Sequence, residues 1–139
     1  MQRLVRDGVA LAFDDAGSGA PPILLVHGWP HDHTYLAPQF AHFSERHRVV
    51  SVDLRGHGDS DKPEQTYSIQ GFADNLAWQI YELGLHRRVV VGHSMGAAAV
   101  LDLAGRYGDR TSAAVLLDPS TFIPPEVRAA LEPTTAGLE

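Results

Sequence analysis

One serine stands where a nucleophile is expected. Ser94 lies at the centre of Gly92-His93-Ser94-Met95-Gly96, between an apolar run ending at Val91 and an alanine-rich segment. A strand-to-helix turn here is so sharp that the residues two before and two after the serine meet, and only small residues such as Gly92 and Gly96 fit. The turn would hold the Ser94 hydroxyl above the positive end of the next helix. The motif therefore predicts a nucleophilic serine.

A second candidate segment is His27-Gly28-Trp29-Pro30, which directly follows the apolar run Ile23–Val26. Acyl transfer develops negative charge on a carbonyl oxygen, and preorganised N–H donors stabilise that charge. The loop could carry such a donor, and the Trp29 side chain could form a wall of the substrate cavity. His27 is expected to fix the geometry of the loop together with Gly28, rather than to transfer protons.

The segments that would position these residues alternate between strand-like and helix-like patterns. Asp7-Gly8 is a two-residue turn signal, so the flanking segments predict a hairpin. Continuous apolar runs are typical of strands that are covered on both faces. Such strands alternating with helices predict a mainly parallel, doubly covered sheet of the α/β class. The predicted strands are Gln2–Val5, Val9–Asp14, Ile23–Val26, Arg48–Asp53, Arg88–Val91 and Ala113–Leu117; the predicted helices are Thr34–Arg46, a helix from Ser68 that ends at Gly84, and Met95–Tyr107.

Three ordered motifs carry a family resemblance. They are His-Gly-Trp-Pro from His27, Asp-Leu-Arg-Gly-His-Gly-Asp-Ser from Asp53 to Ser60, and the glycine-flanked serine motif around Ser94. Together they resemble the α/β-hydrolase superfamily, in the branch with esterases, cofactor-free haloperoxidases and epoxide hydrolases. The resemblance implies an oxyanion hole made by the N–H groups of Met95 and Trp29. It also implies that residues 1–119 hold about six of eight core strands and that residues 120–139 begin a cap or connecting segment.

The residue at the turn narrows the chemistry. Members of this superfamily that attack saturated carbon carry a carboxylate there, whereas Ser94 is similar to the members that acylate at a carbonyl. Esters, thioesters, lactones, amides and cleavable diketones stay open, and a carboxylic ester is favoured. His31-Asp32-His33 is also similar to a loop of the cofactor-free dioxygenases, which share this fold. A dioxygenase and a non-catalytic remnant are therefore the alternatives.

The triad of this superfamily runs in the order serine, acid, histidine along the chain. Asp118, after the sixth predicted strand, stands where some members carry the acid, although a turn-forming Asp-Pro is the favoured explanation. The sequence has eight histidines and none follows His93. We therefore expect the chain to be the N-terminal part of a longer hydrolase, without the base, and no imidazole nitrogen within about 3.2 Å of Ser94 Oγ.

Composition limits the partners. The 139 residues carry a formal net charge of −6, which argues against a surface that binds nucleic acid. No apolar run could span a bilayer, and the start does not resemble a secretory signal. The absence of cysteine fits a cytoplasmic protein. His31 and His33 lack a third ligand at suitable spacing, so neither a metal nor a cofactor is expected, and the loop should be solvated.

We expect a small-molecule substrate. We also expect the chain to associate with itself, because Val115-Leu116-Leu117 would form an apolar strand at the edge of the sheet. Such edges favour self-association.

Overall fold

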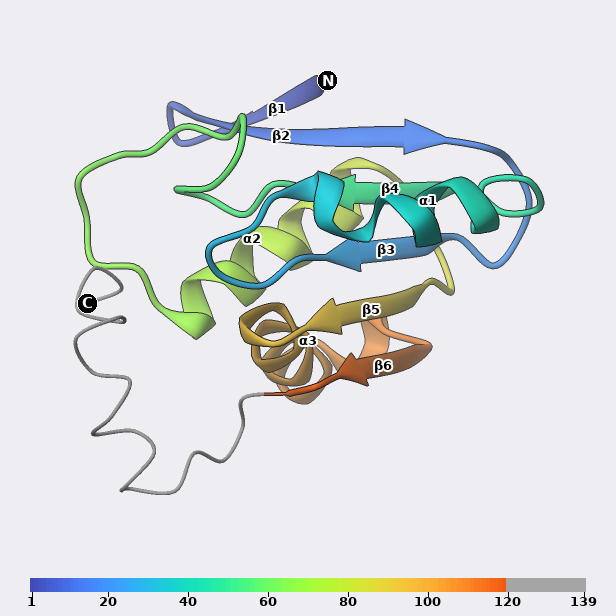
Figure 1. The fold of residues 1–139 in the computed structure, drawn as a ribbon. Helices are drawn as coiled ribbons and strands as arrows, with labels where there is room; N and C mark the ends of the chain where they lie inside the picture. The colour runs from blue at the N-terminus through green and yellow to red at the C-terminus, as the bar shows by residue number, and fades with distance from the viewer. Residues whose placement is uncertain (120–139) are drawn as a thin grey trace.

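The computed structural model describes residues 1–119, which form a six-stranded sheet in the order β1-β2-β4-β3-β5-β6 (Figure 1). The strands are β1 (Gln2–Arg6), β2 (Val9–Ala16), β3 (Ile23–Val26), β4 (Val49–Val52), β5 (Val89–His93) and β6 (Ala113–Leu117). The β1–β2 hairpin is antiparallel, and β2 pairs antiparallel with β4. The pairs β3–β4, β3–β5 and β5–β6 are parallel. The α/β sheet predicted from the sequence is confirmed.

The hairpin turn follows the expected chemistry. Asp7 and Gly8 both adopt positive φ, at 51° and 78°, as the two central residues of a type I′ turn require. Aspartate and glycine are two of the residues that tolerate this conformation. The predicted hairpin is thereby confirmed, with each strand slightly longer than its predicted range.

Helices cover both faces of the sheet. A 3₁₀ turn at His33–Leu36 and α1 (Ala37–Phe43) lie on one face, while α2 (Ile69–Glu82) and α3 (Met95–Arg106) lie on the other (Figure 1). A second 3₁₀ turn spans Gly108–Arg110. The single helix predicted over Thr34–Arg46 is wrong. Pro38 stands in the first turn of α1, where its missing N–H costs nothing, so the α-helix begins there rather than earlier.

The central strands are buried on both faces, as their continuous apolar runs predict. Leu24, Val26, Val50 and Val52 pack with α2 and α3 residues, and all four are fully buried. Their neighbours along the strands, including Ile23, Leu25 and Val49, pack with Leu36 on the opposite face. This alternation fixes the register of the sheet, because a shift by one residue would exchange the two faces.

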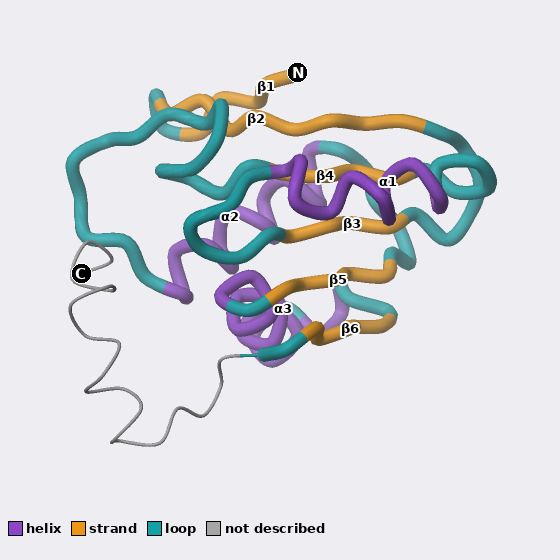
Figure 2. Tube along the Cα trace, in the orientation of Figure 1, coloured by secondary structure: helices purple, strands orange, loops and turns teal. Residues whose placement is uncertain are grey.

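The parallel register brings the functional segments together. Val26 pairs with both Val52 and Gly92, so β3, β4 and β5 end at one edge of the sheet. The loops that follow these strands gather there (Figure 2). In open α/β sheets, ligands bind at this carboxyl edge. The expected cap or connecting segment, residues 120–139, lies outside the described residues. No helix in the described range is long and apolar enough to cross a membrane.

Candidate active site

Ser94 occupies a strained turn between β5 and α3. Its backbone has φ 52° and ψ −114°, a combination that costs a non-glycine residue about 1–3 kcal/mol. The Ser94 N–H donates to Leu117 O at 3.0 Å, and the Ser94 carbonyl accepts from Ala98 N at 3.2 Å. Within residues 1–119 the Ser94 Oγ makes no hydrogen bond, not even as a helix cap. The turn therefore holds the backbone firmly and leaves the hydroxyl free.

The backbone can adopt this turn only because two of its residues, Gly92 and Gly96, have no side chain. A Cβ at Gly92 would lie 2.5 Å from Gly96 O, and a Cβ at Gly96 would lie 2.3 Å from His27 O and 2.6 Å from Val26 O. Real Cβ atoms do not approach backbone oxygens so closely. The crowding expected from the motif is present, and the position of Gly96 is set by β3 as well as by the turn.

Gly28 brings the loop after β3 against the turn. A Cβ at Gly28 would lie 3.0 Å from Ser94 Cβ and 2.9 Å from His93 O. The next residue is Trp29, whose backbone N–H donates no hydrogen bond within the described chain. The Met95 N–H, at the first position of α3, likewise has no acceptor there, as is usual for the first helical N–H groups. One unbonded donor, at Met95, therefore directly follows Ser94, and the other, at Trp29, directly follows Gly28, which packs against the turn.

His27 is held by the backbone. Its side chain is buried, its Nδ1 lies 2.8 Å from Gly28 O, and its Nε2 lies 3.1 Å from the N–H of Leu54. The donor at Leu54 requires a bare Nε2, so the proton is on Nδ1 and is donated to Gly28 O. Desolvation by burial lowers the pKa of His27 to about 4. His27 thus links the loops after β3 and β4 as a neutral ring, in the structural role predicted for it.

Asp53 organises the loop after β4. Its buried carboxylate accepts from the His33 N–H at 2.7 Å and from the Asp59 N–H at 2.8 Å. His33 Nδ1 lies 2.9 Å from the same Asp53 oxygen. Ser60 Oγ donates to Asp53 O and accepts from the Ala12 N–H. The bonds of Asp53 and Ser60 thus hold the loop after β4 in place.

The expectation that the His31–His33 loop is solvated is wrong for His33. Its side chain is only 17% exposed and reaches both Asp53 and, at 3.6 Å, Asp14. Sequence reasoning missed this contact, because the two residues are separated by 20 positions and meet only through the pairing of β3 with β4. A signal was present in the charged Asp53 directly after a fully apolar strand, since a buried carboxylate requires partners.

His31 and His33 have different partners. The His31 ring stacks on Tyr35 at 4.0 Å between centroids, and Tyr35 lies 4.7 Å from the His93 ring. All eight histidines of the sequence lie within residues 1–119, and none hydrogen-bonds to Ser94 Oγ. The expected distance of more than about 3.2 Å between any imidazole nitrogen and Ser94 Oγ stays a prediction.

Asp118 follows β6 beside the serine turn. The Ser94 N–H donates to Leu117 O, and Asp118 is the residue that follows Leu117. It is exposed and has a positive φ of 47°. Its carboxylate makes no hydrogen bond with another described residue. The structure thus places Asp118 near the turn without showing a role for it.

One group of side chains has ligand atoms at metal-binding spacing. Oxygen or nitrogen atoms of Asp32, His33 and Asp53 lie within 4.8 Å of one another. These atoms already have partners, since Asp32 Oδ1 caps the 3₁₀ turn through Thr34, and both Asp53 oxygens accept backbone N–H groups. The group is explained by its structural bonds.

Comparison with known proteins identifies the fold family of the chain. A sequence model of the alpha/beta hydrolase fold family matches residues 21–134. The 2-(acetamidomethylene)succinate hydrolase of Mesorhizobium japonicum is 36% identical over 124 residues, which cover 89% of this chain and 44% of that enzyme. A non-heme chloroperoxidase of Kitasatospora aureofaciens is 36% identical over 122 residues, 86% of this chain and 43% of the relative.

Solved structures give the same result. A thermophilic esterase from Thermogutta terrifontis superimposes with a TM-score of 0.86 at 31% identity, over 99% of this chain and 53% of the esterase. The chain therefore spans about half the length of the proteins it matches. Both the matched segment and the relatives show that the chain belongs to the α/β-hydrolase fold family, as the three sequence motifs predicted.

Proposed function

We propose that this chain carries the nucleophile and the oxyanion hole of a serine hydrolase that cleaves a carboxylic ester through an acyl-enzyme. The observation that carries the proposal is the serine turn itself. Ser94 is held in a strained conformation with an unbonded hydroxyl. The unbonded Met95 N–H directly follows it in the chain, and the unbonded Trp29 N–H follows Gly28, which packs against the turn. Strain and unsatisfied polar groups are retained where they serve function.

The chemistry assigns one role to each group. Ser94 Oγ attacks the ester carbonyl carbon and loses its proton to a base, while the carbonyl oxygen becomes an oxyanion. The Met95 and Trp29 N–H groups bind that oxyanion. Collapse breaks the bond to the alkoxide, which takes the proton and leaves as the alcohol. Water then releases the acid by the same route and regenerates Ser94.

The base is the part that residues 1–119 do not supply. No imidazole of these residues bonds to Ser94 Oγ, and His27, which follows the strand paired with β5, is held by the backbone. Loss of the base of a triad costs several powers of ten in rate, roughly 10⁴ to 10⁶. We therefore expect ester turnover by the 139-residue chain alone to be close to background. Asp118 is the candidate acid, because it follows β6 next to the turn.

The test compares ester turnover by the full-length protein and its variants. Ser94→Ala should abolish turnover, whereas Ser44→Ala, which removes an exposed hydroxyl from the end of α1, should leave it intact. Undiminished turnover in Ser94→Ala would refute the acyl-enzyme. Oxygen uptake that survives the same substitution would favour the dioxygenase of this fold, in which the serine orients the substrate.

A further inference from the structure

A cavity of about 280 Å³ has Trp29, of the loop after β3, among its lining residues. It lies between the loops that follow β3 and β4 and the start of α2, and its walls include Trp29, His57, Lys62, Tyr67 and Phe72. Trp29 links the cavity to the serine turn, because it directly follows Gly28, where an added Cβ would lie only 3.0 Å from Ser94 Cβ. A substrate with its carbonyl at Ser94 can therefore extend into this cavity.

Lys62 gives the cavity a defined cation. It is the single lysine of the sequence, and its Nζ donates to Gly58 O at 2.5 Å and to Ser60 O at 3.2 Å. An ammonium group has three donors, so two carbonyls fix its position and leave one N–H available. Within residues 1–119, Lys62 forms no ion pair with a carboxylate. The loop therefore orients a positive charge without neutralising it.

Two acidic residues of the same loop have partners elsewhere, and the exposed carboxylates of Asp59 and Glu64 form no ion pair with Lys62. Asp53 is buried, and its oxygens accept from His33 and from the Asp59 N–H. Asp61 accepts from the Ala10 N–H and pairs with Arg3 at 3.7 Å. No carboxylate lines the cavity, although the whole chain carries a net charge of −6. An isolated cation in such a pocket would favour anionic ligands over neutral ones.

We infer that this cavity binds a carboxylate, so that the substrate is an ester with a free carboxylate, such as the half-ester of a dicarboxylic acid. The reacting carbonyl lies at Ser94, and the carboxylate accepts from Lys62 Nζ. Tyr67 and Phe72 contact the carbon chain between them. The assignment of the carbonyl rests on the proposed function, whereas the binding of a carboxylate at Lys62 does not.

Selective modification of the single lysine tests the inference on the 139-residue chain itself. The rate of acetylation of Lys62 is measured by mass spectrometry with and without monomethyl glutarate, and the N-terminal amine serves as the internal control. The uncharged monoamide of the same length, methyl 4-carbamoylbutanoate, is the matched ligand. A carboxylate that hydrogen-bonds to the ammonium group holds it in the unreactive charged form and should slow acetylation about threefold. We expect this protection from the acid and none from the amide.

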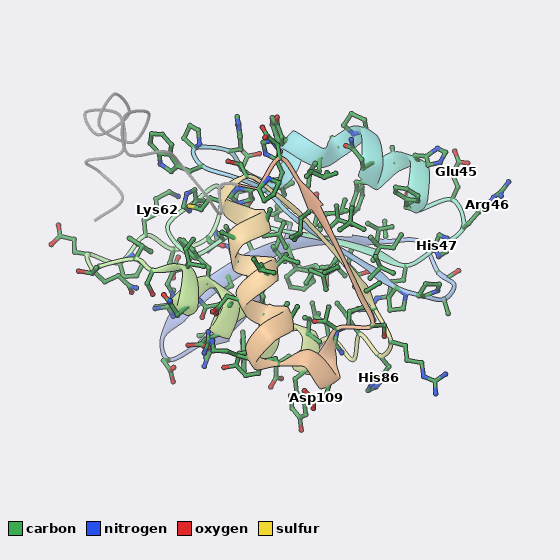
Figure 3. The ribbon with its side chains drawn as sticks, turned by 90° about the horizontal axis from the view of Figure 1, so that it is seen from below. Glu45, Arg46, His47, Lys62, His86 and Asp109 are labelled. Atoms are coloured by element: carbon green, nitrogen blue, oxygen red, sulfur yellow. The ribbon has the colours of Figure 1, made fainter. Side chains whose placement is uncertain are left out.

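Variants separate this inference from the proposed function. Ser94→Ala should keep the protection, because the hydroxyl is not needed to bind the carboxylate. Arg46→Gln, which removes one positive charge at the opposite end of the molecule (Figure 3), should keep it as well. Equal acetylation rates of Lys62 with the acid, the amide and no ligand would overturn the inference, even if Ser94 proved to be the nucleophile.

Steady-state kinetics of the full-length protein provide a second readout. We expect kcat/KM to be about tenfold higher for the p-nitrophenyl half-ester of glutarate than for its amide counterpart, an advantage of about 1.4 kcal/mol. Lys62→Gln should reduce this ratio to about one, whereas Arg46→Gln should preserve it. A ratio that is unchanged in Lys62→Gln would contradict the inference.

Discussion

The loop after β4 and the turn after β5 reach the same edge of the sheet, yet the key polar groups of the loop are hydrogen-bonded and those of the turn are not. In the β4 loop, Asp53 and Ser60 use their side chains to bind backbone and side-chain partners. In the β5 turn, Ser94 Oγ and the Met95 N–H have no partner in the described chain. A saturated network stabilises a loop, and unsatisfied groups are available for a substrate. We therefore assign a structural role to the loop after β4 and a candidate chemical role to the turn after β5, although both lie at the same edge of the sheet.

The largest effect is expected from closing the space at the serine turn. Gly96→Ala places a Cβ on the backbone oxygens of Val26 and His27, so either β3 or the turn must move. We expect a loss of stability of about 4 kcal/mol and, in the full-length enzyme, at least a hundredfold (~10²) loss of kcat/KM. Urea unfolding and ester kinetics measure the two effects.

Gly105→Ala is the matched control for that substitution. Gly105 lies in α3, and a Cβ there meets nothing within 4 Å. Alanine is favoured over glycine inside a helix, so we expect a gain of about 0.5–1 kcal/mol. Equal stability changes at Gly96 and Gly105 would contradict the account of crowding at the turn.

The saturated network of the β4 loop should respond in stability. Asp53→Asn replaces an acceptor with an amide that points N–H groups at the donors of His33 or Asp59. We expect a loss of about 3 kcal/mol, as is typical when one partner of a buried charged network is removed. Asp59→Asn, on an exposed side chain, should change stability by less than about 0.5 kcal/mol in the same unfolding experiment.

His27 should make the fold sensitive to mild acid. Its pKa is about 4 in the folded chain, against an ordinary value of 6.5, so between these pH values the unfolded chain binds a proton that the folded chain does not. Stability is therefore fully present above pH 6.5 and falls as the pH drops to 4, by up to about 3 kcal/mol. Urea unfolding across this window should lose that slope in His27→Gln and keep it in the exposed-site control His86→Gln. A slope unaffected by His27→Gln would contradict the assignment.

A change at the β6 edge of the sheet should alter the self-association of the chain rather than its fold. β6 is the last strand of the described sheet, and Val115 is 42% exposed. We expect the 139-residue chain to dimerise or aggregate through this edge, and Val115→Lys to reduce the association, because edge lysines oppose strand pairing. Light scattering at increasing protein concentration measures it. A monomeric parent chain would contradict this prediction.

Several features were predictable because their signals are local. The apolar run Ile23–Val26 coincides with β3, and Ser68 caps α2 through the Gly71 N–H as its residue type suggests. The glycines around Ser94 follow from the steric demands of one turn. Each of these rests on residues close together in sequence.

Other features depend on contacts that no local pattern contains. The partnership of His33 with Asp53 requires two loops to meet across the sheet. The long helix predicted around α1 failed for a different reason. Its helical segment is short and has no fully buried residue, so Pro38 and the loop geometry determine where it begins.

The most direct test of the central claim is covalent labelling of the full-length protein with a fluorophosphonate, followed by peptide mass spectrometry. The adduct should lie on Ser94 and should vanish in Ser94→Ala, whereas Asp118→Asn should slow the labelling if this residue orients the base. A protein that turns over esters while its adduct forms on another residue, or while Ser94 stays unmodified, would contradict the assignment of Ser94 as the nucleophile.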